Sequence, residues 1–546
     1  YAQRYSMTDD FPFAEINVFQ LGLYAQDKWT VSDKLNLTLG LRIDVPFFMT
    51  DLQSNDKVAA ETYRDGIKID VSKYPNAKPQ FSPRFGFNYK PFDDENGSLQ
   101  IRGGTGLFTG TPPYVWISNQ AGNNGVLFGD LNVRAVKDKN DNIISDGRPS
   151  LGFTGNMDTY KPAEGSATRS DIAITDPDFK YPSLWKSNIA ADYKFGDGWV
   201  ATIELLYSKD INAIYHDNIG LYRTEQFVND GGAGNARPYY NGYYSDREGN
   251  QKAANHVVML RNTSKGHSLY TTFQLQKNFV DGILKGLYLN GSYSFGQSRG
   301  VTDGTSSVAT SAWKYRAALD GNAEEVGYTA GSFDGRLLLS ASYTANWSKY
   351  AATSFGLIYQ RYRPFRYSYC YNGDANGDSQ FSNDLMYIPA NFDEVKDHLL
   401  PGDFDSQEDA WKAMNAFIEQ DPYLSKHRGE YAERNGAVAP FANQLDLSVS
   451  HDIKIYQKNG RSHTLRFSFN IANFLNLLNR NWGVVQTTVL GNQQYQFLTI
   501  PKGQGPSAAN NYTLKYTMAK DLDETFKDNL NDVSRWQMQF GIKYIF

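Results

Sequence analysis

The sequence has 546 residues, of which 54 are Lys or Arg and 59 are Asp or Glu, so its formal net charge is −5. This mildly acidic balance argues against a nucleic-acid-binding protein, which normally carries a basic face. The single cysteine, Cys370, excludes a disulfide framework and a cysteine-based zinc site. No apolar stretch is long enough to predict a transmembrane helix. Aromatic residues nevertheless make up 14% of the chain, while hydrophobic residues total only 40%, a combination that is common in barrels whose outer wall meets lipid.

Hydrophobic and polar residues alternate with a period of two along many segments, as they do in strands with two different faces. Leu35 to Ile43 is one such segment, and Trp536 to Phe546 is another. The thirteen strands that this pattern predicts lie near residues 17–30, 34–46, 81–92, 98–110, 184–195, 199–213, 267–279, 285–298, 335–347, 351–366, 442–456, 462–474 and 535–546. The alternation alone also fits a soluble β-sandwich.

The lengths of the connections favour a membrane barrel over a sandwich. Paired strands are joined by short turns such as Gly196-Asp197-Gly198 and Lys458-Asn459-Gly460. Long polar segments separate the pairs, near residues 47–80, 111–183, 214–266, 299–334, 367–441 and 475–534. Short turns at one rim and long loops at the other are typical of outer-membrane barrels, whereas most connections of a sandwich are short at both ends.

We therefore predict an all-β fold, a transmembrane antiparallel β-barrel in the outer membrane of a Gram-negative bacterium, with periplasmic turns and extracellular loops. Aromatic residues beside the short turns, such as Trp29 and Trp347, are expected to form the girdle where strands leave the lipid. A general preference of aromatics for strand ends is the alternative explanation. The polar strand positions predicted to line the lumen include Arg42, Thr202, Glu204, Gln274, Gln276, Asn290 and Arg466.

The number of predicted strands is odd, whereas single-chain bacterial barrels are antiparallel and have an even number. We therefore expect that these strands do not close by themselves, and that further strands or a partner chain complete the wall. The chain begins at Tyr1 without a Met or a signal peptide, so a processed or partial chain is expected.

Several motifs resemble the barrels of TonB-dependent receptors. They are Leu23-Tyr24-Ala25-Gln26-Asp27-Lys28-Trp29 with Leu37-Thr38-Leu39-Gly40-Leu41-Arg42, Ser82-Pro83-Arg84-Phe85-Gly86-Phe87, Arg102-Gly103-Gly104-Thr105-Gly106-Leu107-Phe108, Phe333-Asp334-Gly335-Arg336, Asn383-Asp384-Leu385-Met386-Tyr387-Ile388-Pro389 and the closing strand up to Phe546. Together they most resemble the large Oar-like receptors of Bacteroidetes.

This resemblance implies an outer-membrane barrel of about 22 strands, occluded by an N-terminal plug on which a TonB-ExbB-ExbD complex pulls. It also implies a small periplasmic domain of the carboxypeptidase-regulatory type. On this basis residues 1–546 are the C-terminal part of one transmembrane barrel domain, and the plug and the periplasmic N-terminal domain are absent from this chain.

The function expected from the resemblance is active uptake of an unidentified substrate. A structural, adhesive or protein-export barrel is the alternative. The partners expected are outer-membrane lipid and lipopolysaccharide, TonB-ExbB-ExbD by resemblance, and a surface lipoprotein or other outer-membrane partner. We do not expect an enzyme, because the seven histidines are scattered and no HExxH motif occurs.

The sharpest local motif is Asp374-Ala375-Asn376-Gly377-Asp378-Ser379-Gln380, with Asp384 further on. Oxygen-bearing side chains at alternate positions resemble a calcium loop. The residues that would bind a structural Ca²⁺ are Asp374, Asn376, Asp378, Gln380 and Asp384. The motif departs from an EF-hand, which has Gly at position 6 and Glu at position 12, where this chain has Ser379 and Leu385. An ordinary turn rich in Asp and Asn is the alternative.

A helix is predicted after Ser406 in the same long segment. Ser406 and Asp409 have the spacing of a helix N-terminal cap. The apolar residues that follow at helical spacing are Ala410, Trp411, Met414, Phe417 and Ile418. We expect this apolar stripe to pack against neighbouring loops.

Overall fold

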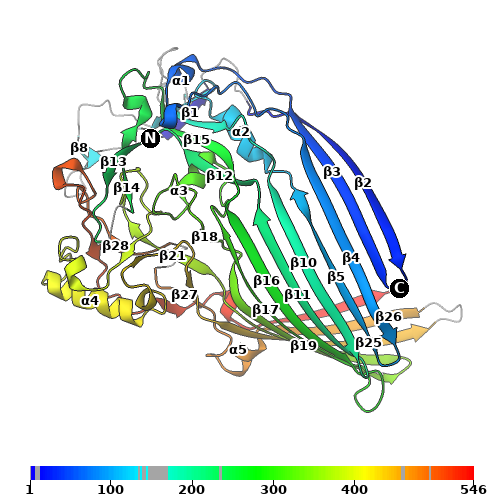
Figure 1. The fold of residues 1–546 in the computed structure, drawn as a ribbon. Coiled ribbons are helices and arrows are strands. Elements are labelled where there is room, and N and C mark those ends of the chain that lie inside the picture. Colours follow the sequence, from blue (N-terminus) through cyan, green and yellow to red (C-terminus); the bar gives the residue numbers. More distant parts are fainter. Residues whose placement is uncertain are drawn as a thin grey trace.

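The computed structural model describes residues 2–6, 13–132, 136–137, 143–144, 156, 170–232, 236–456, 462–490 and 494–546. Its main element is one long antiparallel sheet that curves around an open side (Figure 1). The strands follow one another in this sheet as β2 (Val18–Ser32), β3 (Leu35–Phe48), β4 (Gln80–Asp94), β5 (Gly97–Thr109), β10 (Ser183–Phe195), β11 (Trp199–Asp210), β16 (Gly266–Asn278), β17 (Leu287–Gly300), β19 (Phe333–Ser348), β20 (Ala351–Tyr362), β25 (Ala442–Tyr456), β26 (Ser462–Ala472) and β31 (Gln537–Ile545). The short strand β18 (Gly327–Tyr328) pairs with β17 beside this path.

The thirteen strands predicted from alternation are therefore confirmed. Each one pairs with the previous and the next of these thirteen along the chain. Short turns join them as expected; Phe195 pairs with Trp199 across Gly196-Asp197-Gly198. The predicted turn Lys458-Asn459-Gly460 lies outside the described residues. β20 ends at Tyr362, earlier than predicted, because Pro364 follows and has no N–H with which to continue a ladder.

The two faces of the sheet differ in chemistry. Apolar side chains such as Leu39 and Ile203 are 52% and 46% exposed on one face, which suits contact with lipid. On the other face, side chains of neighbouring strands pair with one another: Arg102 with Asp192 at 2.9 Å, and Gln274 with Asn290 at 2.8 Å. The remaining positions predicted for the lumen also make polar contacts on this face; these are Arg42, Thr202, Glu204, Gln276 and Arg466.

Aromatic side chains gather at the rim where the short turns lie. Phe92, Tyr193, Phe195 and Trp199 form a continuous row on β4, β10 and β11, with successive ring centroids 6.2, 5.2 and 6.3 Å apart. The ammonium group of Lys277 lies 5.4 Å from the Trp199 ring. Such a row has the composition of an interfacial girdle, whose rings are apolar and whose edges are wet.

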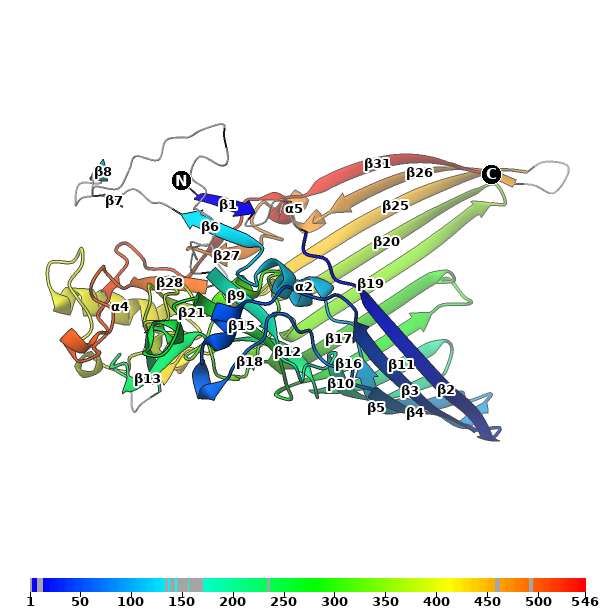
Figure 2. The ribbon, with the colours of Figure 1, turned by 90° about the horizontal axis from the view of Figure 1, so that it is seen from above.

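The path of the sheet ends at β2 and β31, and neither pairs with a second strand of the sheet among the described residues. Figure 2 shows these two strands at opposite margins of the curved sheet. Side chains of both strands are exposed along almost their whole length. A closed barrel leaves no unpaired edge, so the described strands form an open wall, as the odd strand number led us to expect.

The long connections fold into a layer at the other end of the strands (Figure 1), here called the loop layer. Its sheets are β12-β15-β9 (Ala213–Asn218, Ala254–Thr263, Ser170–Thr175), β24-β21-β28-β29 (Ala437–Val438, Arg366–Asn372, Gln494–Thr499, Thr517–Met518), β13-β14 (Leu221–Phe227, Pro238–Tyr243), β1-β6 (Ala2–Ser6, Phe128–Asn132), β7-β8 (Val136–Lys137, Ile143–Ile144), β22-β23 (Tyr387–Ile388, Glu430–Tyr431) and β27-β30 (Gln486–Thr488, Phe526–Asp528). Its α-helices are α1 (Asp56–Ala60), α2 (Tyr114–Gly122), α3 (Ala309–Lys314), α4 (Gln407–Gln420) and α5 (Phe474–Leu478). No helix in the described part of the chain is long and apolar enough to cross a bilayer.

The largest buried core of the protein lies in this loop layer rather than in the wall. It joins Tyr371 and Phe417 of one connection to Phe497 of the next, and all three are at most 1% exposed. The predicted helix is confirmed as α4: Ser406 accepts a hydrogen bond from the Asp409 N–H at 3.1 Å. The apolar stripe of α4 packs into this core as expected, with Trp411 partly buried beside it.

Candidate functional site

The candidate site lies in the connection between β21 and β22. The carboxylate of Asp374 folds this segment: Oδ1 accepts from the N–H groups of Asn376 (3.2 Å) and Gly377 (2.6 Å), and Oδ2 accepts from that of Ser379 (2.8 Å). Ser379 has a φ of 68°. It stands sixth from Asp374, where an EF-hand uses Gly to make a sharp bend, so the left-handed bend is present although the residue differs.

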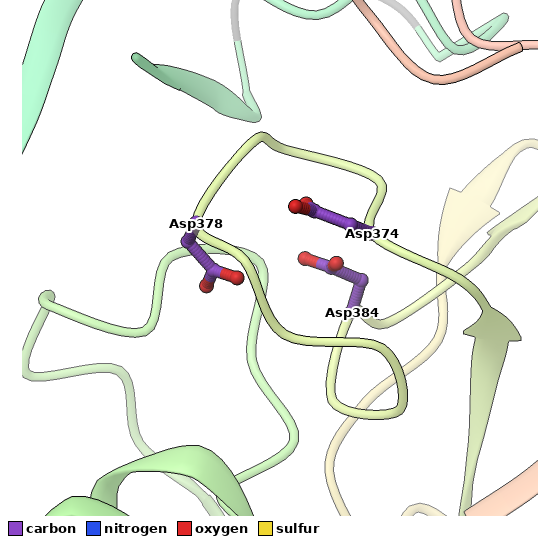
Figure 3. Close-up of side chains that lie close together, drawn as sticks. All are labelled: Asp374, Asp378 and Asp384. Atoms are coloured by element: carbon purple, nitrogen blue, oxygen red, sulfur yellow. The ribbon is translucent and has the colours of Figure 1, made fainter. Parts of the chain in front are cut away.

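Three carboxylates converge inside this segment (Figure 3). One oxygen each of Asp374, Asp378 and Asp384 lies within 4.8 Å of the other two. Asp384 is held in place by the N–H of Ala375, which donates to its Oδ2 at 2.9 Å. Asp378 and Asp384 are almost completely buried. This is the only such group of metal-binding side chains in the part of the chain that the structure describes.

The two amide residues of the motif lie against Asp378. The Asn376 Oδ1 accepts from the N–H of Asp378 at 2.9 Å, and its Nδ2 donates to Asp378 Oδ2 at 3.4 Å. The N–H of Gln380 donates to Asp378 Oδ1 at 2.8 Å. The Gln380 Nε2 is buried and has no hydrogen-bond partner among the described residues. Of the five predicted residues, the structure brings the carboxylates of Asp374, Asp378 and Asp384 together. The other two, Asn376 and Gln380, contact Asp378.

Arg237, from a different connection, completes the surroundings of the cluster. Its guanidinium is fully buried and donates to Asp384 Oδ1 and to Asp230 Oδ2, both at 3.0 Å, and to the carbonyl oxygen of Leu385. Arg237 lies 147 positions before Asp384, so no local spacing in the sequence could reveal this pair.

β14 fixes the position of the acidic segment. The N–H of Tyr240 donates to the carbonyl oxygen of Asn376 at 2.8 Å. Gly377 has a φ of 84°, and a Cβ built there would lie 2.2 Å from the Tyr240 carbonyl oxygen. Only glycine therefore allows this close approach between the two segments.

The charges in this buried region do not balance. The region holds the four carboxylates of Asp230, Asp374, Asp378 and Asp384, and Arg237 forms ion pairs with only two of them, Asp230 and Asp384. Burial raises the pKa of Asp374, raises that of Asp378 well above its usual range, and raises that of Asp384 to about 7 although Arg237 opposes the last shift. Buried charge is costly unless it is paired or binds a metal. The cluster is therefore suited to retain protons or to bind a hard cation.

The wall has strands with one apolar and one polar face, short turns at one rim and a large layer at the other. These features define the outer-membrane β-barrel class. The chain belongs to the family described as outer membrane beta barrel domain, whose model matches residues 1–512. The protein is accordingly a protein of the outer membrane. No relative was found among curated proteins.

Solved structures to which the chain is similar include the ferric preacinetobactin receptor BauA from Acinetobacter baumannii, with 10% identity, a TM-score of 0.38, and coverage of 97% of this chain and 43% of that chain. A mutant of the ferric enterobactin receptor PfeA from Pseudomonas aeruginosa has 9% identity, a TM-score of 0.39, and coverage of 96% and 44%. The copper transporter OprC has 9% identity, a TM-score of 0.39, and coverage of 96% and 48%. The chain thus spans less than half the length of each of these proteins.

Proposed function

We propose that this chain forms the wall and outer layer of an Oar-like receptor that takes up its substrate across the outer membrane with energy from TonB-ExbB-ExbD. The observation that carries the proposal is the loop layer: its connections share one buried core and lie at one end of a wall whose other face carries paired polar groups. Such a layer offers a preformed capture surface above a hydrated path. The sequence motifs that resemble TonB-dependent receptors support the same function.

In this proposal the polar face of the wall, with Arg102, Asp192 and Arg466 among its residues, lines the path of the substrate. A plug outside residues 1–546 occludes that path until TonB pulls on it. The substrate is unidentified. A structural, adhesive or protein-export barrel is the rival function, because such a barrel would use the same wall and could present the same outer layer.

Depletion of compounds from the growth medium separates the two functions. The host strain, a strain lacking this gene and a strain lacking TonB are compared by mass spectrometry of the spent medium. Uptake predicts that one compound remains in the medium of both deletion strains, and that the gene restores its depletion only where TonB is present. A changed surface or secreted proteome after deletion of this gene, with medium depletion unaltered, would establish the rival function.

We also propose that the acidic segment between β21 and β22 binds a structural Ca²⁺ through Asp374, Asp378 and Asp384. The support is chemical: three carboxylates converge in a buried place where negative charge exceeds positive charge, and Ca²⁺ prefers six to eight oxygen ligands. The carbonyl and amide oxygens of the segment, including those of Asn376 and Gln380, are the further donors available. The ion would fix the acidic segment against β14 and so rigidify the capture surface.

Titration of the metal-free protein with CaCl₂ tests this site directly. Isothermal titration calorimetry on the wild type should show one saturable site that Asp378→Asn removes. Asp393→Asn is the matched control, since Asp393 is an exposed carboxylate beyond β22 whose one ion pair among the described residues is with Lys396 at 3.3 Å. Wild-type protein that gives no binding heat, or Asp378→Asn protein that binds as the wild type does, would refute the calcium proposal.

A further inference from the structure

A second feature of the loop layer is a cavity of about 250 Å³. Four stretches of chain that are distant in sequence form its wall: residues 302–317 around α3, residues 434–435, and the paired strands β21 and β28. Hydroxyl and amide side chains provide much of the lining, namely Thr302, Thr305, Tyr315, Ser368, Asn435 and Gln494. None of the three clustered carboxylates borders this cavity, so it is separate from the candidate metal site.

Two buried guanidinium groups belong to the lining. Arg316 and Arg434 are 5% and 4% exposed, and both donate to the carbonyl oxygen of Val301, which brings the two positive charges close together. Their other hydrogen bonds also go to backbone carbonyl oxygens. Neither forms an ion pair with a described residue, and the Arg316 Nε is buried without a hydrogen-bond partner there.

The lining as a whole is positive, because its charged residues are Arg316, Arg434 and Asp303. Asp303 lies at the exposed rim and accepts from the Ala330 N–H at 2.8 Å and from Asn435 Nδ2 at 2.9 Å. Burial lowers the pKa of Arg316, although the carboxylates of Glu325 and Asp320 oppose this shift. Burial also lowers the pKa of Arg434 to about 10; Asp303 opposes this shift, and repulsion from Arg316 adds to it. Two positive charges held this close without a paired carboxylate are costly, and an anion in the cavity would offset that cost.

We propose that this cavity binds a small anion that carries a carboxylate or phosphate group. Arg316 and Arg434 supply the positive charge that attracts the anion, and the hydroxyl and amide side chains of the lining supply hydrogen bonds. Guanidinium groups suit planar carboxylates and phosphates. Pockets for larger ligands measure about 300–1,000 Å³, so a cavity of about 250 Å³ selects a smaller molecule. Anion binding to this cavity does not depend on the proposed transport, because it can be measured on the purified protein without uptake or TonB.

The test is calorimetric titration of the detergent-solubilised protein with inorganic phosphate and with succinate, at pH 7.5 and constant ionic strength. Gln494→Glu keeps the shape of the lining but adds a negative charge, and should weaken binding by about tenfold. Asp303→Asn removes the negative charge at the rim, and should strengthen binding roughly fivefold. Gln226→Glu is the matched control: it makes the same chemical change at an exposed position of β13 and should leave the affinity unchanged.

Opposite shifts in the two cavity variants, with the control unchanged, would support the site, and the better of the two probes would identify the anionic group. The proposal is overturned if neither phosphate nor succinate binds to the wild type at millimolar concentration. It is equally overturned if both bind but Gln494→Glu and Asp303→Asn leave the affinity as it is, because the anion would then occupy another place.

Discussion

The stability of the acidic segment should fall as pH rises when no divalent cation is present. The pKa of Asp384 is about 7 in the folded protein and 3.8 ordinarily, so between these values the folded state binds more protons than the unfolded state. Each pH unit in this range then costs about 1.4 kcal/mol of stability, or roughly 4 kcal/mol in all. Between pH 5.5 and pH 7.0 we expect a loss of about 2 kcal/mol, to which Asp374 and Asp378 add in the same direction.

Calcium should reverse this trend, because a cation favours the ionised carboxylates and binds better as their protons leave. At a concentration one hundred times its dissociation constant, the ion would add about 2.7 kcal/mol. Hydrogen exchange of peptides covering 373–386, corrected for the intrinsic pH dependence of exchange, measures both effects. The hairpin β16-β17 of the wall serves as the internal reference, and Asp384→Asn should remove most of the pH dependence in the absence of calcium.

Equal protection of this segment at pH 5.5 and pH 7.0 in metal-free protein would refute the argument from burial. Greater protection at the higher pH would refute it more strongly, since the sign would then be that of carboxylates stabilised by their partners. If the pH dependence is found but calcium leaves it unchanged, the electrostatic description stands and the calcium proposal fails.

Three further predictions concern packing and the membrane. Gly377→Ala should destabilise the loop layer by more than about 2 kcal/mol, because the new Cβ would lie 2.2 Å from a carbonyl oxygen. Gly503→Ala is the control: Gly503 has a similar φ but open space around it, so this change should lower the stability by about 1 kcal/mol. Thermal melting temperatures of the two variants test the difference. Phe417→Ala removes a side chain that is 1% exposed and should cost about 3–5 kcal/mol, seen as faster proteolysis of the loop layer. Leu41→Arg, on the apolar face, should cost about 2–4 kcal/mol and reduce the protein in outer-membrane fractions; Thr38→Arg, on the polar face, should not, and equal loss in both would contradict the assignment of faces.

The wall could be predicted from sequence because its information is local. A strand with two different faces leaves its alternation in a dozen consecutive residues, and a turn such as Gly196-Asp197-Gly198 fixes the neighbour of each strand. The same holds for α4, whose cap at Ser406 and apolar spacing lie within one segment. The acidic segment could also be predicted from local sequence, since Asp374, Asp378 and Asp384 lie in one short continuous segment.

The loop layer could not be predicted, because its contacts join distant segments. β21 pairs in parallel with β28, so that Tyr369 lies beside Tyr495, and nothing in either strand specifies this partner. Arg237 reaches Asp384 in the same way. Apart from the apolar stripe of α4, the long polar connections therefore gave no sign of a buried core.

The shared core of the loop layer has a consequence for how the protein assembles. Val228, Phe417 and Phe497 belong to connections that are separated from one another by strands of the wall. Because the core is shared, no single connection can bury its own apolar side chains. They therefore remain exposed to solvent until all the intervening strands have inserted into the bilayer. The loop layer is thus the last part to fold. A protein stalled during insertion would expose apolar, protease-sensitive segments that are buried in the folded protein.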